Sequence, residues 1–114
     1  MSTRRVVITG LGLLSPLGNE VENSWSNLLA GMNPVKQIQY FDTSDYDTKF
    51  AASLPSFDSE KYLEKKEIRR LDRFIQYGVA ASKECILDSG IDESNTNFER
   101  IGVSIGSGIG GLGT

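Results

Sequence analysis

Two short apolar runs, each followed at once by closely spaced glycines, constrain the fold of this chain more than any other feature. The first run is residues 5–9, before the Gly-Leu-Gly of residues 10–12, and the second is residues 100–105, before the glycine-rich stretch 106–113. Continuous β-branched and apolar runs are typical of strands that are covered on both faces, as in a parallel sheet with helices on each side. The sequence therefore predicts an α/β fold.

A first helix is predicted shortly after the first strand. The segment 15–18, Ser-Pro-Leu-Gly, has the composition of a turn. Asn19 is placed to cap the helix, with Glu22 completing a capping-box-like pair. Gly31 is placed to end it. The apolar residues between these signals have helical spacing and form one face: Val21, Trp25, Leu28 and Leu29.

Residues 32–58 have weaker signals and are expected to form a connection with small elements. Residues 38–41 are compatible with a short strand, and residues 42–45, Asp-Thr-Ser-Asp, with a turn in which aspartate side chains bond the backbone. A second short extended piece is expected at residues 50–52, closed by Pro55.

The longest periodic stretch predicts a helix that starts in the charged segment 59–66 and ends at Gly90. A glycine at that position suits the left-handed conformation that follows many helices. The residues that keep helical spacing are Ile68, Leu71, Ile75, Val79, Ser82 and Ile86.

Composition excludes several classes of function. The 114 residues suffice for one small domain, and the net charge of −3 gives no overall basic field for nucleic acid. No run of 18 apolar residues is present, so no membrane span is expected. The lone Cys85 cannot form an internal disulfide, which fits a cytoplasmic location. The chain has no histidine, which removes Ser-His-Asp and Cys-His catalysis.

Cys85 itself is interpreted as a packing residue. It is expected near the C-terminal end of the long helix, where the helix dipole disfavours a thiolate. A free cysteine in such a position usually behaves as a small hydrophobic side chain.

The two glycine clusters are compared with the dinucleotide-binding fingerprint. In the first cluster Ser15 stands where the third glycine should be. The second cluster satisfies the pattern with Gly106, Gly108 and Gly111, but a following helix and an acidic residue are also required, and the chain contains neither. Nucleotide binding therefore stays an alternative to a close-packed turn in which glycine avoids clashes with another segment.

Five cations fall within nine residues in the first half of the long helical stretch. Four of them, Lys66, Arg69, Arg70 and Arg73, are three or four residues apart, so they share one face of the predicted helix. This face is either a solvated surface, partly neutralised by nearby acids, or a docking patch for an acidic partner. The cations are Lys65, Lys66, Arg69, Arg70 and Arg73.

Several motifs, in order and at matching spacing, resemble the beta-ketoacyl-acyl-carrier-protein synthases. The opening of the chain carries the first of them, and the middle stretch resembles the type II branch of that family. The motifs are residues 4–12, 14–19, 25–31, 40–44, 48–51, 72–78 and 105–112.

The resemblance implies the N-terminal portion of a thiolase-like layered α/β/α fold, with residues 1–114 as a truncated first quarter. It implies a cytoplasmic homodimeric enzyme of fatty-acid elongation that moves an acyl group onto a cysteine and condenses it with malonyl-carrier protein by decarboxylation. It implies no cofactor, no metal, no nucleic acid and no membrane. The family's nucleophilic cysteine and two catalytic histidines are expected downstream of this chain, which alone is expected to be inactive.

Two sets of site residues follow from the resemblance. Lys66, Arg69 and Arg70 match the basic face with which the family binds acidic acyl-carrier protein. Ile109 matches a residue that lines the acyl-chain pocket near the dimer interface. A non-catalytic module that binds acyl-carrier protein is the alternative function.

Overall fold

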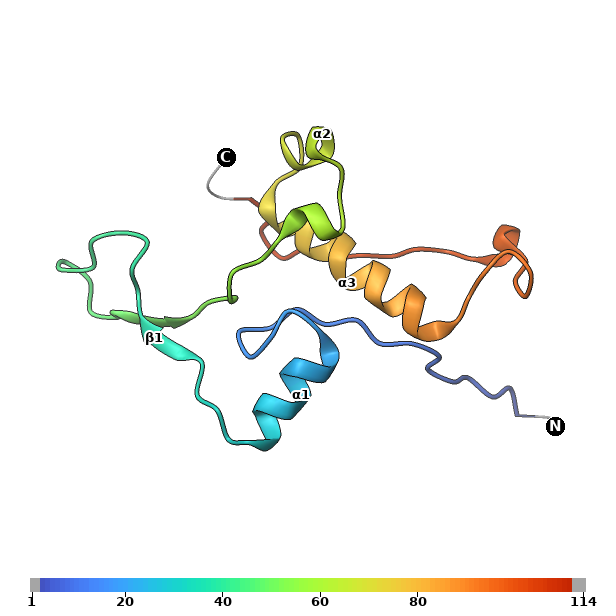
Figure 1. The fold of residues 1–114 in the computed structure, drawn as a ribbon, viewed down its shortest axis with the longest axis horizontal. Helices are drawn as coiled ribbons and strands as arrows, with labels where there is room; N and C mark the ends of the chain where they lie inside the picture. The colour runs from blue at the N-terminus through green and yellow to red at the C-terminus, as the bar shows by residue number, and fades with distance from the viewer. Residues whose placement is uncertain (1–2, 112–114) are drawn as a thin grey trace. The chain divides into compact units, whose positions relative to one another are not determined.

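The structure is a computed structural model that describes residues 3–111. Residues 13–57 form one compact unit, and residues up to 12 together with those from 58 onward form a second unit. The elements in chain order (Figure 1) are α1 (Val21–Leu29), β1 (Val35–Gln37), β2 (Phe50–Ala52), the 3-10 helix η1 (Ser59–Lys61), α2 (Lys65–Ile68), α3 (Arg73–Ser89) and the 3-10 helix η2 (Phe98–Arg100).

Helix α1 has the predicted extent but a different N-terminal cap. Glu20, in extended conformation, is the N-cap residue. Asn19 does not cap the helix: its amide oxygen, the atom that would accept a helix N–H, has no hydrogen-bond partner among the described residues, and its amide nitrogen donates to the carbonyl of Ser56 at 2.9 Å. The C-terminal end agrees with prediction: Gly31 has a φ of 68°, and the N–H of Met32 reaches back to the carbonyl of Asn27 at 3.0 Å.

Strands β1 and β2 form an antiparallel pair, with Lys36 opposite Ala51. β2 lies at the predicted position, whereas the expected strand at residues 38–41 is wrong: β1 ends at Gln37. One further backbone bond, from Ile38 to the carbonyl of Lys49 at 2.9 Å, extends the ladder before the chain turns away. The pairing thus ends before the aromatic residues that suggested a strand.

The long helical stretch is interrupted, contrary to prediction. α2 is four residues long, and α3 begins only at Arg73, after Asp72 in extended conformation. An extended residue breaks the pattern of α-helical backbone hydrogen bonds. The apolar residues therefore keep helical spacing across Asp72 although the backbone there is not helical. The C-terminal end at Gly90, with a φ of 65°, agrees with prediction.

The two apolar runs that predicted strands are not strands here. Residues 5–9 and 101–105 are irregular, and Arg100 closes η2. Val6 is 89% exposed and Val103 is 83% exposed. A strand exists only with a hydrogen-bonded neighbour, and within residues 3–111 neither run has one (Figure 1).

The first glycine pair packs closely against α3. A Cβ on Gly10 would lie 2.7 Å from the backbone nitrogen of Ser89, and a Cβ on Gly12 would lie 2.9 Å from that of Cys85. The N–H of Leu11 between them donates to the Asp88 carboxylate at 2.8 Å. Glycine at both positions therefore allows this segment to lie directly on the helix backbone.

Few apolar side chains are buried within residues 3–111: these are Leu63 and Ala80. Four polar residues are buried, namely Ser24, Thr43, Ser59 and Gln76. None of the described helices is long and apolar enough to span a membrane.

Candidate functional site

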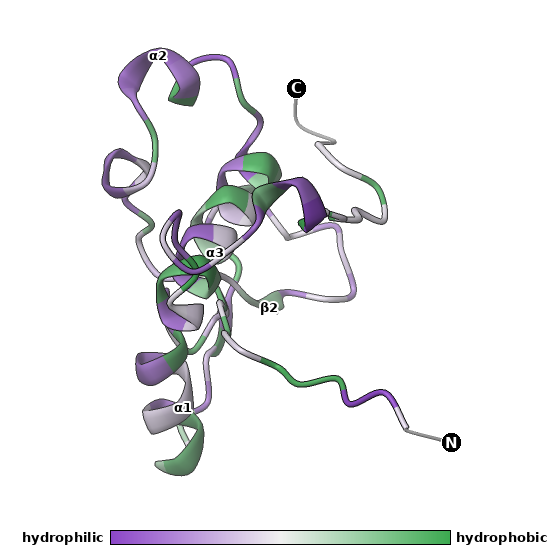
Figure 2. Ribbon diagram, turned by 90° about the vertical axis from the view of Figure 1, so that its right-hand side faces the viewer, coloured by the Kyte–Doolittle hydropathy of each residue, from purple (hydrophilic) through white to green (hydrophobic). Residues whose placement is uncertain are grey.

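The predicted cationic cluster lies on α2, on the turn that follows it and on the first residue of α3, shortly after η1. Asp58 caps η1 by accepting the N–H of Glu60 at 3.0 Å. α2 is predominantly hydrophilic (Figure 2) and has no buried residue. Arg69 is its C-cap residue, and Arg70 follows in the turn that leads to Asp72. The cluster is therefore divided among a short helix, a turn and the start of α3, and does not lie on one face of a long helix.

The five cations divide into two groups by their contacts. Lys65 approaches the carboxylate of Glu60 at 3.7 Å in an exposed ion pair. Arg73 points elsewhere: its guanidinium donates to the Ser59 hydroxyl at 3.4 Å and lies 6.0 Å from the centroid of the Tyr77 ring. Arg73 is therefore bound within its own unit.

Lys66, Arg69 and Arg70 form the second group. All three are exposed, and within residues 3–111 no ion pair or hydrogen bond occupies their side chains. We call these three residues the docking face. Their freedom leaves three cationic groups available to an acidic surface, while the other two cations are held by local partners.

Gln76 lies beneath the docking face and was not anticipated from the sequence. Its side chain is buried and contacts three neighbouring segments. The amide nitrogen donates to the carbonyls of Ile68 at 3.1 Å and Leu71 at 2.7 Å, and the amide oxygen accepts from the Ser59 hydroxyl at 2.6 Å. Its sequence position within a helical pattern gives no signal of burial, because glutamine is usually exposed.

Ile109 lies in the glycine-rich loop and is 79% exposed. The following residue, Gly110, has a φ of 83°, and a Cβ there would lie 3.4 Å from the Phe74 ring. A mostly apolar hollow of about 410 Å³ lies between α3 and residues 105–107; its lining residues are Phe74, Ile75, Gly78, Val79, Ile105, Gly106 and Ser107. Ile109 is two residues after the last of these lining residues and does not itself line the hollow.

Gly106 and Gly108 of this second cluster do not make the close-packed turn that the sequence allows for it, whereas a Cβ on Gly110 would make ordinary contact with the Phe74 ring. A Cβ on Gly106 or Gly108 would meet nothing within 4 Å. The close packing occurs instead at Gly10 and Gly12, in the cluster that lacks a third glycine. Nucleotide binding would need a helix after this loop, and the positions where such a helix would start lie outside the described residues.

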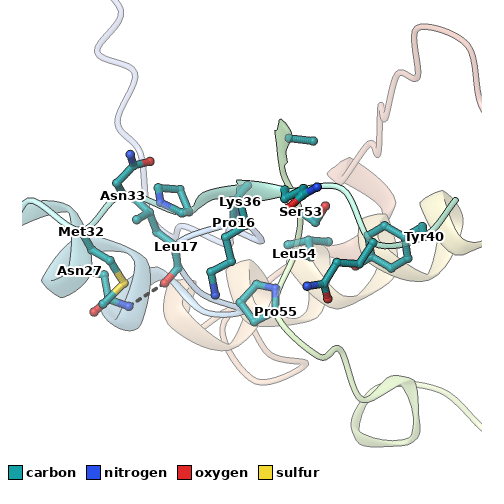
Figure 3. A pocket seen from close by; sticks show the side chains of 14 residues that line it. Pro16, Leu17, Asn27, Met32, Asn33, Lys36, Tyr40, Ser53, Leu54 and Pro55 are labelled. Atoms are coloured by element: carbon teal, nitrogen blue, oxygen red, sulfur yellow. Dashed lines mark hydrogen bonds between the residues drawn. The ribbon is translucent and has the colours of Figure 1, made fainter. Parts of the chain in front are cut away.

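A larger cavity, of about 610 Å³, lies in the unit of residues 13–57 (Figure 3). The Asn27 amide donates to the carbonyl of Leu17 at 2.7 Å at its edge. Lys36 and Tyr40 are the ionisable side chains among its lining residues. The lining therefore contains no pair of carboxylates for acid–base work.

Cys85 has the packing role that was predicted for it. It is half-buried, and its thiol donates to the carbonyl of Gly10 at 3.4 Å. Within residues 3–111, no group of three acidic, cysteine or histidine side chains is placed to hold a metal ion.

Comparison with known proteins gives a consistent result. The family model described as "Beta-ketoacyl synthase, N-terminal domain" matches residues 3–114. The "3-oxoacyl-(acyl-carrier-protein) synthase 2" of Vibrio cholerae is 54% identical over 112 residues, which are 98% of this chain and 27% of that protein. The protein of the same name in Staphylococcus aureus is 47% identical over 111 residues, 97% of this chain and 27% of that protein.

A solved structure agrees with the sequence relatives. "The ishigamide ketosynthase/chain length factor" matches with a TM-score of 0.72 and 32% identity, over 82% of this chain and 23% of that chain. This likeness confirms the predicted fold class, the N-terminal portion of a thiolase-like layered α/β/α fold. The chain spans about a quarter of the length of the proteins it matches.

Proposed function

Because this chain belongs to the beta-ketoacyl synthase family, we propose that its protein is a condensing enzyme of fatty-acid elongation that uses substrates on acyl-carrier protein. The match to the family model over residues 3–114 carries this proposal, and the names of the relatives supply the substrate class. Neither the nucleotide-binding alternative nor the non-catalytic module is favoured by these comparisons.

The proposed reaction has two steps. A cysteine thiolate attacks the thioester that links the acyl group to carrier protein, which gives a new acyl-cysteine thioester and releases the thiol of the carrier protein. Malonyl-carrier protein then loses carbon dioxide, and the resulting carbanion attacks the thioester carbonyl, forming a carbon–carbon bond and expelling the thiolate. Cys85 is not the nucleophile, because its sequence context does not match that of the family's cysteine and it packs against Gly10. The family's catalytic residues match no position in this chain.

The contribution of this chain is substrate docking. Lys66, Arg69 and Arg70 are exposed and free of local partners, so they can meet acidic side chains on carrier protein without first breaking an ion pair. Complementary charge of this kind raises the rate of encounter and fixes orientation.

One experiment tests both parts of the proposal. The protein that carries this chain is incubated with acyl- and malonyl-carrier protein, and formation of 3-oxoacyl-carrier protein is measured. The double variant Arg69→Glu/Arg70→Glu is expected to raise KM for the carrier-bound substrates by roughly tenfold with kcat nearly unchanged, because docking is lost and chemistry is not.

The exposed adjacent pair Arg4 and Arg5 provides a matched control. Arg4→Glu/Arg5→Glu makes the same change of charge outside the docking face and is expected to leave KM within about twofold. Failure of the unmodified protein to form product would refute condensation. A normal KM in the Arg69→Glu/Arg70→Glu variant would refute docking at this face.

The homodimeric state and the cytoplasmic location implied by the resemblance are also proposals. They rest on membership of the family alone. Analytical ultracentrifugation of the protein that carries this chain tests the first, and cell fractionation tests the second.

A further inference from the structure

The docking face lies on and directly after α2, a helix that is too short to be stable by itself. α2 spans four residues and has no buried residue. A single helical turn in water is unstable because its nucleation cost exceeds the gain from one or two hydrogen bonds. The position of Arg69 and Arg70 must therefore be fixed by contacts that bind this segment to a more stable element.

Gln76 supplies such contacts from α3, a helix of 17 residues. Its side chain is 4% exposed. Its amide nitrogen binds the carbonyls of Ile68 and Leu71, which are the residues immediately before and after Arg69–Arg70. One amide group thus binds the backbone on both sides of Arg69 and Arg70.

A third hydrogen bond holds the other end of the Gln76 amide, its oxygen. The Ser59 hydroxyl, 6% exposed as a residue, donates to the amide oxygen of Gln76 and accepts from Arg73. This arrangement fixes which end of the amide is the donor. It also holds Arg73 away from the docking face. Every polar atom of the buried amide has a partner, so the group stabilises this geometry without an unpaired donor or acceptor.

We propose that Gln76 is a positioning residue for carrier-protein docking: it sets the spacing and direction of the Arg69 and Arg70 guanidinium groups without touching the partner. This inference rests on the docking function proposed above. Loss of the Gln76 hydrogen bonds leaves the charge of the face unchanged, but each arginine must then be ordered during binding, which weakens the complex.

The test measures the affinity of the protein that carries this chain for acidic acyl-carrier protein by fluorescence titration. Gln76→Met keeps the length and the charge but removes both donors and the acceptor, and we expect Kd to rise about threefold to tenfold. The exposed Gln39 offers the matched control, and Gln39→Met is expected to leave Kd unchanged.

A double-mutant cycle separates positioning from general stability. If Gln76 acts through the arginines, Gln76→Met has no further effect on the weaker residual binding of an Arg69→Ala/Arg70→Ala background. A penalty of equal size in both backgrounds overturns the inference, as does an unchanged Kd in Gln76→Met alone. Should Gln76→Met not fold, Ser59→Ala removes the bond to the amide oxygen together with the bond from Arg73, and leaves the two bonds from Gln76 to Ile68 and Leu71 in place. A smaller loss of affinity is then expected, again absent in the Arg69→Ala/Arg70→Ala background.

The outcomes distinguish this inference from the docking proposal. Normal binding by Arg69→Ala/Arg70→Ala, or absence of binding by the unmodified protein, overturns docking and the inference together. Weakened binding by the arginine variant with normal binding by the Gln76 and Ser59 variants preserves docking and overturns only the positioning role.

Discussion

Two aspartates each accept a pair of hydrogen bonds from the serine two residues later in the chain. Oδ1 of Asp42 accepts from the backbone N–H of Ser44 at 3.0 Å and from its hydroxyl at 2.5 Å. Asp92 and Ser94 repeat the arrangement at 2.7 Å and 2.5 Å. Because these bonds favour the charged carboxylate, the side chains and backbone of the serines lower the pKa of both aspartates.

Replacement of Ser44 by alanine should raise the pKa of Asp42 toward its ordinary value near 3.8. The hydroxyl is the larger of the two causes, and the backbone bond remains in the variant. Since the folded pKa is lowered, the stabilisation is present above the unfolded pKa and is lost as pH falls through the folded pKa. The pKa is followed by carbon NMR of the carboxyl group.

Asp92 is the internal control for that titration, because its own serine is unchanged. Its pKa should stay the same in Ser44→Ala. An Asp42 pKa that does not rise would mean that the hydroxyl bond is absent in solution.

At the residue scale, sequence reasoning succeeded where a side chain bonds its own neighbours. The turn at residues 42–45 was expected from aspartate and serine alone, and local bonds form it. It missed Gln76, because that side chain is defined by Ser59, Ile68 and Leu71, and no local pattern specifies such partners.

At the scale of elements, the C-terminal ends of helices were predicted better than their N-terminal ends or their continuity. Gly31 and Gly90 both follow helices with positive φ, as a glycine in a helical pattern indicates. The break at Asp72 was missed because residues on both sides keep apolar spacing. Apolar spacing of three or four residues indicates which side chains would share one face of a helix. It does not show whether the backbone stays helical between them.

The close approach of residues 10–12 to α3 gives a prediction at the same scale. In Gly12→Ala, the new Cβ would overlap the Ala81 carbonyl group and approach the Cys85 nitrogen to 2.9 Å. These are backbone atoms of a helix and cannot rotate aside, so the segment must move. We expect the free energy of unfolding to fall by about 1–3 kcal/mol, measured by urea denaturation.

Gly102→Ala is the control for this loss. A Cβ at Gly102 would meet nothing within 4 Å, and its φ is not positive, so stability should be unchanged or slightly raised. Equal stability of the Gly12 and Gly102 variants would show that the segment does not lie on α3 in solution.

At the scale of the whole molecule, the sheet of the described residues consists of β1 and β2 and includes neither of the apolar runs that were predicted to be strands. The runs at residues 5–9 and 101–105 have the composition of strands covered on both faces, yet they are exposed and unpaired within residues 3–111. Composition indicates the environment in which a segment is stable, and it does not indicate which segment pairs with it. The fold class was therefore predictable, mainly from the resemblance, whereas the pairing was not.

The acyl-chain pocket that the family resemblance implies at Ile109 stays a proposal, and a substitution at this residue tests it. Its side chain is 79% exposed, and the described residues do not enclose it. If other parts of the protein complete a pocket around it, a larger ring at this position shortens the space available to an acyl chain. Ile109→Phe should lower the ratio of kcat/KM for long relative to short acyl substrates by roughly tenfold. Ile91→Phe, outside the glycine-rich loop, should leave that ratio unchanged. An unaltered ratio in Ile109→Phe would remove this residue from the pocket, while docking at Lys66, Arg69 and Arg70 would stand.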